Sequence, residues 1–211
     1  MTCLISFEGG DGCGKSTQLK LTATWLRARG CVVLETRQPG ATPLGLEIRR
    51  LLLSGEHQPV PECELLMFLA DRVQHVKTVI QPALDAGQWV LCDRYSDSTL
   101  AYQLAARQLG ESETLLSMLR FAEAGCTPVQ TFWLDLPVSE SLERLRMRQG
   151  LGGEYSRLDQ ESLDFHRRVQ QAFQVIYQEH RSRMIRIDGD HAEQVVQDEI
   201  RQHLKVLMSH G

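Results

Sequence analysis

A glycine-rich segment near the start of the chain carries a lysine and a serine at a spacing that could bind phosphate. Residues 9–16 read GGDGCGKS and match the pattern G-x-x-x-x-G-K-[ST]. The apolar run Cys3–Phe7 precedes them, and a helical stretch begins at Lys15. Glycines let backbone N–H groups turn inward, and the N-terminal end of a helix adds partial positive charge. The segment therefore predicts a nucleoside triphosphate site.

Two side chains of this segment have separate expected roles. Lys15 is expected to reach the β- and γ-phosphates, and the Ser16 hydroxyl is expected to hold Mg²⁺. The residues predicted to bind ATP are Gly9, Gly10, Asp11, Gly12, Cys13, Gly14, Lys15, Ser16 and Thr17.

Three arginines indicate that a second phosphate group binds nearby. Arg37 and Arg94 each follow a predicted strand, and Arg72 lies on a helix between them. Ligands of open parallel sheets bind beyond the carboxyl ends of the strands, where a guanidinium can grip phosphate oxygens with two hydrogen bonds. No D-x-x-G motif follows the later strands and no N-K-x-D motif is present, which argues against a switch GTPase. A small-molecule kinase fits better than a motor protein, for which the chain is short.

Short apolar runs alternate with longer segments of helical periodicity. This alternation predicts an α/β fold with three layers, in which helices cover both faces of a parallel sheet of about five strands. Helical spacing is clear at Leu44–Leu52, Leu65–Val76 and Phe165–Tyr177. The predicted strands are Cys3–Phe7, Cys31–Thr36, Trp89–Cys92, Thr131–Asp135 and Met184–Asp188.

Length and composition favour a single domain spanning residues 1–211. The chain has 211 residues, of which 42% are hydrophobic and 24% charged, and its formal net charge is −4. This balance argues against a generally cationic nucleic-acid binder. No apolar stretch approaches the ~20 residues that span a membrane, and we expect no membrane partner. The six cysteines form no C-x-x-C pair, so we expect free thiols in the cytoplasm and no zinc site.

A second glycine-rich stretch predicts a mobile lid at about residues 148–158. Gly150–Ser156 reads GLGGEYS and lies between a basic helix, Ser141–Arg148, and the next helical stripe. An arginine carried on such a lid could arrive at the phosphates when the site closes.

Seven ordered blocks of the chain resemble the thymidylate kinases, a family of P-loop nucleoside monophosphate kinases. They begin with FEGGDGCGKST at 7–17 and TRQPG at 36–40 and continue through most of the chain. The later blocks are LMFLADRVQH at 66–75, DRY at 93–95, ST at 98–99, AYQ at 101–103 and SRLDQE at 156–161. The order of these blocks is far more specific than the P-loop alone.

The resemblance implies transfer of a phosphoryl group from ATP-Mg²⁺ to dTMP, giving dTDP for dTTP synthesis, and a homodimer packed through helices. It implies that Arg37 and Arg94 grip the acceptor phosphate and that Asp11 lies near the sugar 3′-hydroxyl. The expected base and sugar pocket is Phe68 stacked on thymine, Arg72 hydrogen-bonded to the base, and Thr99, Tyr102 and Gln103. Asp93 is expected either to help organise Mg²⁺ through water or to orient Arg94.

The position of the basic residues indicates a subtype within this family. Positions 10–13 hold no basic residue, whereas the lid region is rich in arginine, as in bacterial enzymes of the Escherichia-like type. We expect Arg148 and Arg157 to act on the transferring phosphate together with Lys15, Arg94 and Asp11. Arg144 and Arg146 are expected to lie on a solvated helix face.

Several positions depart from the family pattern. Ala41 replaces a glycine of the acceptor loop, Val129 an aspartate before the fourth strand, and Ser156 an aspartate before the lid arginine. Leu104 stands in a run where glycine is expected and could narrow the sugar–base end of the pocket. These departures keep two alternatives open, namely a kinase for another, deoxyuridylate-type monophosphate and a nucleotide-binding protein without turnover.

Overall fold

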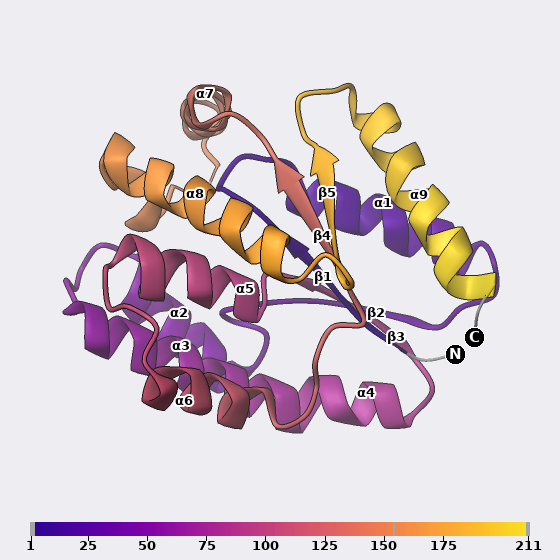
Figure 1. Ribbon diagram of the computed structural model, residues 1–211, viewed down its shortest axis with the longest axis horizontal. Coiled ribbons are helices and arrows are strands. Elements are labelled where there is room, and N and C mark those ends of the chain that lie inside the picture. The colour runs from indigo at the N-terminus through magenta and orange to yellow at the C-terminus, as the bar shows by residue number, and fades with distance from the viewer. Residues whose placement is uncertain (1–2, 154, 210–211) are drawn as a thin grey trace.

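The centre of the molecule is a parallel sheet of five strands in the order β2-β3-β1-β4-β5 (Figure 1). The computed structural model describes residues 3–153 and 155–209. The three-layer α/β prediction is confirmed, and every predicted strand is present to within two residues. The strands are β1 (Leu4–Glu8), β2 (Val33–Arg37), β3 (Trp89–Asp93), β4 (Gln130–Asp135) and β5 (Met184–Asp188).

One face of the sheet is covered by α1 (Lys15–Arg27) and α9 (Glu193–Ser209), which also contact each other. Ile5 and Phe7 of β1 point to this side and pack with buried residues of α1 such as Leu26. The neighbouring strand residue Leu4 packs on the opposite face, as the two-residue period of a strand requires. The central strand is therefore buried on both sides and holds the P-loop rigidly at its carboxyl end.

The other face is covered by a larger set of helices (Figure 1). Hydroxyl caps begin several of them, with Thr42 Oγ1 accepting from Gly45 N and Ser162 Oγ from Phe165 N. Two segments, η1 and η2, are π-helical and continue α3 and α5 directly. The elements are α2 (Pro43–Leu53), α3 (Pro61–His75), η1 (Val76–Ile80), α4 (Gln81–Asp85), α5 (Ser96–Thr99), η2 (Leu100–Ala106), α6 (Glu113–Glu123) and α8 (Leu163–Glu179).

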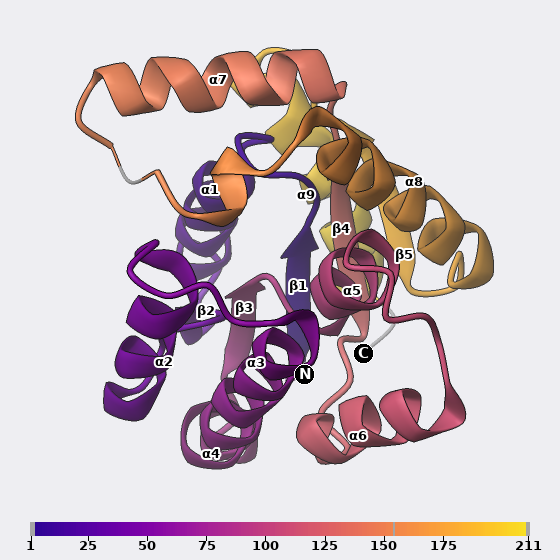
Figure 2. The same cartoon turned by 90° about the vertical axis from the view of Figure 1, so that its left-hand side faces the viewer.

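Helix α7 (Val138–Gly150) lies across the carboxyl ends of the strands and leads into the predicted lid region (Figure 2). The chain then passes through a short 3₁₀ turn, η3 (Leu158–Gln160), before α8 begins. Of the predicted lid, residue 154 lies outside the described residues. This arrangement puts the lid region above the P-loop, on the side where ligands of parallel sheets bind.

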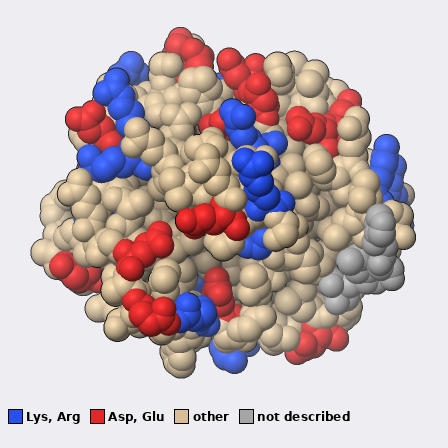
Figure 3. Space-filling view, viewed as in Figure 1, with Lys and Arg blue, Asp and Glu red and all other residues tan. Residues whose placement is uncertain are grey.

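The surface mixes charges of both signs. Lys and Arg side chains are interspersed with Asp and Glu on the face drawn in Figure 3. Across residues 3–153 and 155–209, every helix is too short or too polar to cross a lipid bilayer.

Candidate active site

The P-loop connects β1 to α1 and owes its shape to glycines with positive φ. Gly9, Gly12 and Gly14 have φ values of 135°, 83° and 94°. A Cβ on Gly9 would lie only 2.5 Å from the backbone oxygen of Leu134 on β4. Glycine is thus required at this position by both backbone conformation and space. The glycine-rich loop therefore has the backbone geometry that its sequence pattern predicts.

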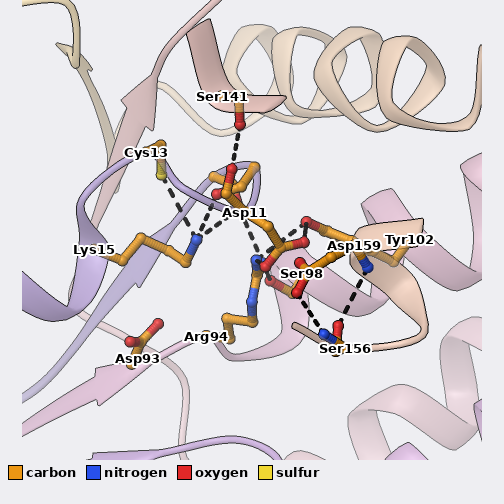
Figure 4. Close-up of polar contacts among 12 residues, drawn as sticks. Asp11, Cys13, Lys15, Asp93, Arg94, Ser98, Tyr102, Ser141, Ser156 and Asp159 are labelled. Carbon is orange, nitrogen blue, oxygen red and sulfur yellow. Dashed lines mark hydrogen bonds and ion pairs between the residues drawn. The ribbon is translucent and has the colours of Figure 1, made fainter. Parts of the chain in front are cut away.

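Lys15 lies across this loop, at the first residue of α1. Its Nζ donates to the backbone oxygen of Gly10 at 2.6 Å and to that of Gly9 at 3.2 Å (Figure 4). The side chain is only 6% exposed, so its charge acts in a region of reduced solvent screening. The ammonium group is therefore held next to the site where the loop can receive phosphate.

Ser16 and Asp93 form a pair of oxygen donors beside the P-loop. The Ser16 hydroxyl donates to Asp93 Oδ2, and Asp93 ends β3 opposite Phe7 of β1. A hydroxyl and a carboxylate are hard oxygen ligands that suit Mg²⁺, which usually takes its remaining ligands from water and substrate phosphates. Within the described residues, no cluster of three His, Cys, Asp or Glu side chains could hold a metal alone. The pair fits an ion that arrives with a nucleotide.

Asp11 and Arg94 form the centre of the site (Figure 4). Arg94 donates to Asp11 Oδ1 at 2.5 Å and to the Gly9 oxygen at 2.9 Å, while the Tyr102 hydroxyl donates to Asp11 Oδ2 at 2.7 Å. Burial by itself disfavours a charged carboxyl, but Arg94, Lys15 and the Tyr102 hydroxyl hold the pKa of Asp11 well below its usual value. Asp11 is consequently ionised at neutral pH.

The left-handed backbone of Arg94 is anchored by a buried carboxylate. Arg94 has a φ of 69°, which is uncommon for a side chain with a Cβ. Glu8, the last residue of β1, accepts from the Tyr95 amide at 2.6 Å and from the Ser98 hydroxyl at 2.5 Å. Burial, and then the charge of Asp97, raise the pKa of Glu8 to about 7. These bonds brace the turn that carries Arg94.

A second cationic position lies deeper, where α3 meets α5. Arg72 is 2% exposed, donates from Nε to Gln38 Oε1 at 2.9 Å and from Nη2 to Thr99 Oγ1 at 2.9 Å. Its Nη1 is buried and has no hydrogen-bond partner within the described part of the chain. Phe68 lies one turn earlier on α3 and lines the same cavity. A flat ring and a free donor are what a planar, carbonyl-bearing base needs.

One cavity of about 460 Å³ joins the P-loop to this deeper position. Most predicted site residues meet there. Among those lining it are Asp11, Gly12, Gly14, Lys15, Ser16, Thr17, Arg37, Phe68, Arg72, Asp93, Arg94, Thr99, Tyr102 and Gln103. Gly9, Gly10 and Cys13 shape the loop behind it without lining it, and buried Cys13 accepts from Lys15 Nζ at 3.6 Å.

The lid arginines divide into two groups. Arg148 lines the cavity and pairs with Asp159 at 3.3 Å, with its side chain 47% exposed. Arg157, expected beside it, is 8% exposed, pairs with the buried Glu64 and donates to the Leu52 oxygen at 3.0 Å. Arg157 therefore ties the end of the lid region to α3 and does not line the cavity.

Arg144 is a cavity residue that sequence reasoning missed. It was expected on a solvated face of α7, and its side chain is 40% exposed, but it also lines the cavity and donates to the Gly189 oxygen at 3.4 Å. The spacing of Arg144 and Arg148, one helical turn apart, is the signal that could have found it, because residues i and i+4 share a helix face.

The expectation that Leu104 narrows the pocket is wrong. Leu104 is 1% exposed and packs with Leu65, Leu69 and Leu119, away from the cavity. Tyr102 and Gln103 of η2 line the cavity, while the next residue, Leu104, belongs to the core. Leu104 therefore gives no reason to expect an acceptor pocket different from that of the resembling family.

The other departures also lie outside the cavity lining or are accommodated. In the acceptor loop the positive φ of 102° falls on Gly40, and Ala41 is not among the residues with positive φ. Val129 is 46% exposed just before β4. Ser156 lines the cavity and exchanges bonds with Asp159, through its amide at 2.7 Å and its hydroxyl at 3.2 Å.

Comparison with known proteins agrees with this geometry. A family model described as thymidylate kinase matches residues 7–200. The chain belongs to the thymidylate kinase family. It is 46% identical to the thymidylate kinase of Nostoc punctiforme over 97% of this chain and 98% of that protein. It is 45% identical to that of Carboxydothermus hydrogenoformans (86% and 87%) and 43% identical to that of Magnetococcus marinus (91% and 90%).

Membership in the thymidylate kinase family makes this chain a nucleoside monophosphate kinase with ATP as phosphoryl donor.

The buried residues that support the site carry weaker sequence signals than the motif residues. Glu8 could have been noticed as an acid ending an apolar strand directly before the P-loop. Gln38, Glu64 and His75 offered no such signal, because their partners come from other elements.

Proposed function

We propose that this chain transfers the γ-phosphoryl group of ATP to dTMP, producing ADP and dTDP for dTTP synthesis. The observation that carries this proposal is the single cavity that runs from Lys15 past Arg94 to Arg72. It offers a phosphate loop at one end, a base-sized pocket at the other, and a cation between them. The membership in the thymidylate kinase family selects dTMP as the acceptor.

In this proposal the acceptor phosphate is bound by Arg37 and Arg94, which both line the cavity. Asp11 holds Arg94 in position and lies near the sugar hydroxyl. The base stacks on Phe68 and receives a hydrogen bond from Arg72, with Thr99, Tyr102 and Gln103 completing the pocket. Positioning of this kind, together with charge stabilisation, is most of what phosphoryl transfer requires.

On the donor side, Lys15 stabilises charge on the β- and γ-phosphates. Ser16 and Asp93 hold Mg²⁺, which neutralises phosphate charge when it is bound. From the lid we propose Arg148, joined by Arg144, as the cations that approach the transferring group. Arg157 was expected in this role too, but its ion pair with Glu64 favours a structural one.

A monophosphate panel tests the proposal directly. ADP release is measured with dTMP, dUMP, dGMP, dAMP and dCMP as acceptors and ATP-Mg²⁺ as donor. We expect the highest kcat/KM with dTMP. No preference for dTMP would reject the thymidylate assignment, and no turnover with any acceptor would reject the enzymatic function.

We also propose that the protein is a homodimer of the cytoplasm. Leu66 on α3 and Phe121 on α6 are 51% and 77% exposed and line an apolar groove between these helices. Such a face favours burial against a second copy. The six cysteines are all unpaired, which suits a reducing compartment. Analytical ultracentrifugation of wild type and Phe121→Asp tests the dimer, and a monomeric wild type would reject it.

A further inference from the structure

Arg72 is held by a buried chain of polar groups that begins on β2 and crosses to α3. Its Nε donates to Gln38 Oε1 at 2.9 Å, and Gln38 Nε2 lies 3.0 Å from His75 Nδ1. His75 Nε2 in turn lies 2.7 Å from the Thr36 hydroxyl. Gln38 and His75 are 5% and 0% exposed, so water competes little for these bonds.

The hydrogen bonds that link these four side chains can run in only one direction from donor to acceptor. A guanidinium can only donate, so Gln38 must present its carbonyl oxygen to Arg72. The amide NH₂ then faces His75 Nδ1, which must accept and therefore carries no proton. His75 is accordingly neutral, with its proton on Nε2 directed to Thr36. Burial, and then the charge of Arg72, lower the pKa of His75 to about 4, in agreement with this order.

Arg37, the arginine proposed to bind the acceptor phosphate, lies between two members of this polar network in the sequence. Thr36 and Gln38, on either side of it, both contact His75, as alternate residues at the end of β2 can. Arg37 and Gln38 both line the cavity. In this arrangement Arg37 contacts the phosphate of the bound monophosphate. Gln38, the next residue, positions Arg72, which contacts the base.

We propose that Gln38, oriented by His75, is a specificity-determining positioning residue that aims Arg72 at the base. With Nε and Nη2 engaged by Gln38 and Thr99, the unpartnered Nη1 is left for the ligand. A donor in that place fits a pyrimidine with a carbonyl at C4 and opposes one with an amino group there. The inference rests on the proposed function, in which Arg72 contacts the acceptor base.

Substitution of Gln38 tests the proposal through two ratios of kcat/KM. In Gln38→Leu, Arg72 Nε loses the oxygen that accepts its hydrogen bond. We expect KM for dTMP to rise about tenfold or more, while kcat changes less than threefold. The preference for dTMP over dCMP should fall about tenfold, because dCMP carries an amino group at C4. The preference for dTMP over dUMP should stay constant, because both carry the carbonyl. General damage to the site would not separate these ratios.

Conservative variants show whether the side-chain oxygen that accepts from Arg72 is responsible for the changes in KM and in the ratios. Gln38→Glu keeps an oxygen for Arg72 and should stay within threefold of wild type in both ratios. His75→Asn can present a side-chain oxygen near the place of Nδ1 and should behave likewise. Gln171→Leu makes the same change on the exposed face of α8 and serves as the control. Gln38→Asn, one methylene shorter, repeats the loss of contact if Gln38→Leu does not fold.

The outcomes separate this inference from the proposed function. Wild type that fails to prefer dTMP rejects the proposed function before any variant is compared. Wild type that prefers dTMP, with Gln38→Leu or Gln38→Asn retaining its KM and its dTMP/dCMP ratio, rejects the inference alone. A rise in KM that Gln38→Glu fails to rescue also rejects it, because the acceptor oxygen is then not the cause.

Discussion

Arg72 and Arg148 both line the central cavity, but the protein holds them in different ways. Arg72 is 2% exposed, and two of its nitrogens donate to buried side chains. The side chain of Arg148 is 47% exposed and has one ion pair, with Asp159 at 3.3 Å. Asp159 is buried, but it also accepts from the Ser156 amide at 2.7 Å, so its carboxylate keeps a partner when the half-exposed Arg148 moves away. Arg72 is thus fixed in place before any ligand binds, whereas the looser hold on Arg148 suits the proposed approach of this cation to a phosphate.

Glu64 extends the same comparison to the two ends of the lid region. At the α7 end Arg148 is loosely held, and at the η3 end Arg157 is buried against Glu64, which is 0% exposed. Arg107 of the loop after η2 also pairs with Glu64, at 3.1 Å. The Glu64 carboxylate on α3 is therefore bonded both to the loop after η2 and to the end of the lid region. If residues 148–158 form the predicted lid, firm attachment at the η3 end alone would let the α7 end reposition.

The largest expected effect is that of removing Lys15, the residue proposed to contact the β- and γ-phosphates of ATP. In Lys15→Ala we expect kcat to fall by about two orders of magnitude or more, the size typical of a lost transition-state charge contact. Steady-state ADP release measures it. Lys20→Ala on the exposed side of α1 is the matched control and should leave kcat unchanged. A fall of less than threefold in Lys15→Ala contradicts the role.

Arg157→Ala should break the firm end of the lid region. Removing one partner of a buried ion pair leaves Glu64 partly uncompensated, and Arg107 offsets only part of the loss. We expect the free energy of unfolding in urea to fall by about 3 kcal/mol. Activity of the folded fraction should change much less than stability. A variant with wild-type stability and a large loss of kcat would show that Arg157 acts in catalysis instead.

Arg148→Ala should have the converse effect. Arg148 is half exposed and Asp159 keeps its bond from the Ser156 amide, so the free energy of unfolding should fall by about 1 kcal/mol or less, well below the loss in Arg157→Ala. We expect kcat to fall about tenfold, since a mobile cation contributes in the closed state only. Arg146→Ala, on the exposed face of α7, serves as the control. Equal kinetics in the two variants would exclude Arg148 from catalysis.

The smallest effect concerns the pH dependence that Glu8 gives to the acceptor side. Its pKa is raised to about 7 in the folded protein from an ordinary value of 4.5, so the folded state binds more protons between these values. Stability from this group is fully present below pH 4.5 and is lost as pH rises through about 7. Between pH 5 and 6 the expected loss is about 1 kcal/mol.

Glu8→Gln cannot titrate and should remove that slope. Urea unfolding at a series of pH values compares it with wild type. Glu35→Gln, at a partly exposed position on β2, is the control and should keep the slope. An unchanged slope in Glu8→Gln would show that Glu8 is already ionised at pH 5.

The motif residues could be located from sequence because their chemistry depends on neighbours along the chain. The spacing of Gly9, Gly14 and Lys15 defines a loop whose shape follows from backbone angles alone. The placement of Arg37 and Arg94 at strand ends follows from the rule that parallel strands share one carboxyl edge. These predictions needed no knowledge of which helices meet.

Predictions that depended on the direction of a side chain were less successful. Leu104 and Arg157 were expected at the cavity, but Leu104 packs in an apolar cluster with Leu65 and Leu69, and Arg157 pairs with the buried Glu64. Arg144 was expected in solvent, yet α7 lies across the strand ends and brings it to the cavity. Period and composition do not encode how one element is rotated against another.

The sequence by itself determined the parallel α/β sheet, the phosphate loop and the family of the chain, because local periodicity and motif spacing are properties of contiguous residues. Only the tertiary structure decided which cations are free and which are bound. That outcome depends on buried partners such as Glu8, Gln38 and Glu64, each brought from a different element. Burial makes an unpaired charge costly, so the packing of distant elements selects the arginines that remain available to substrate.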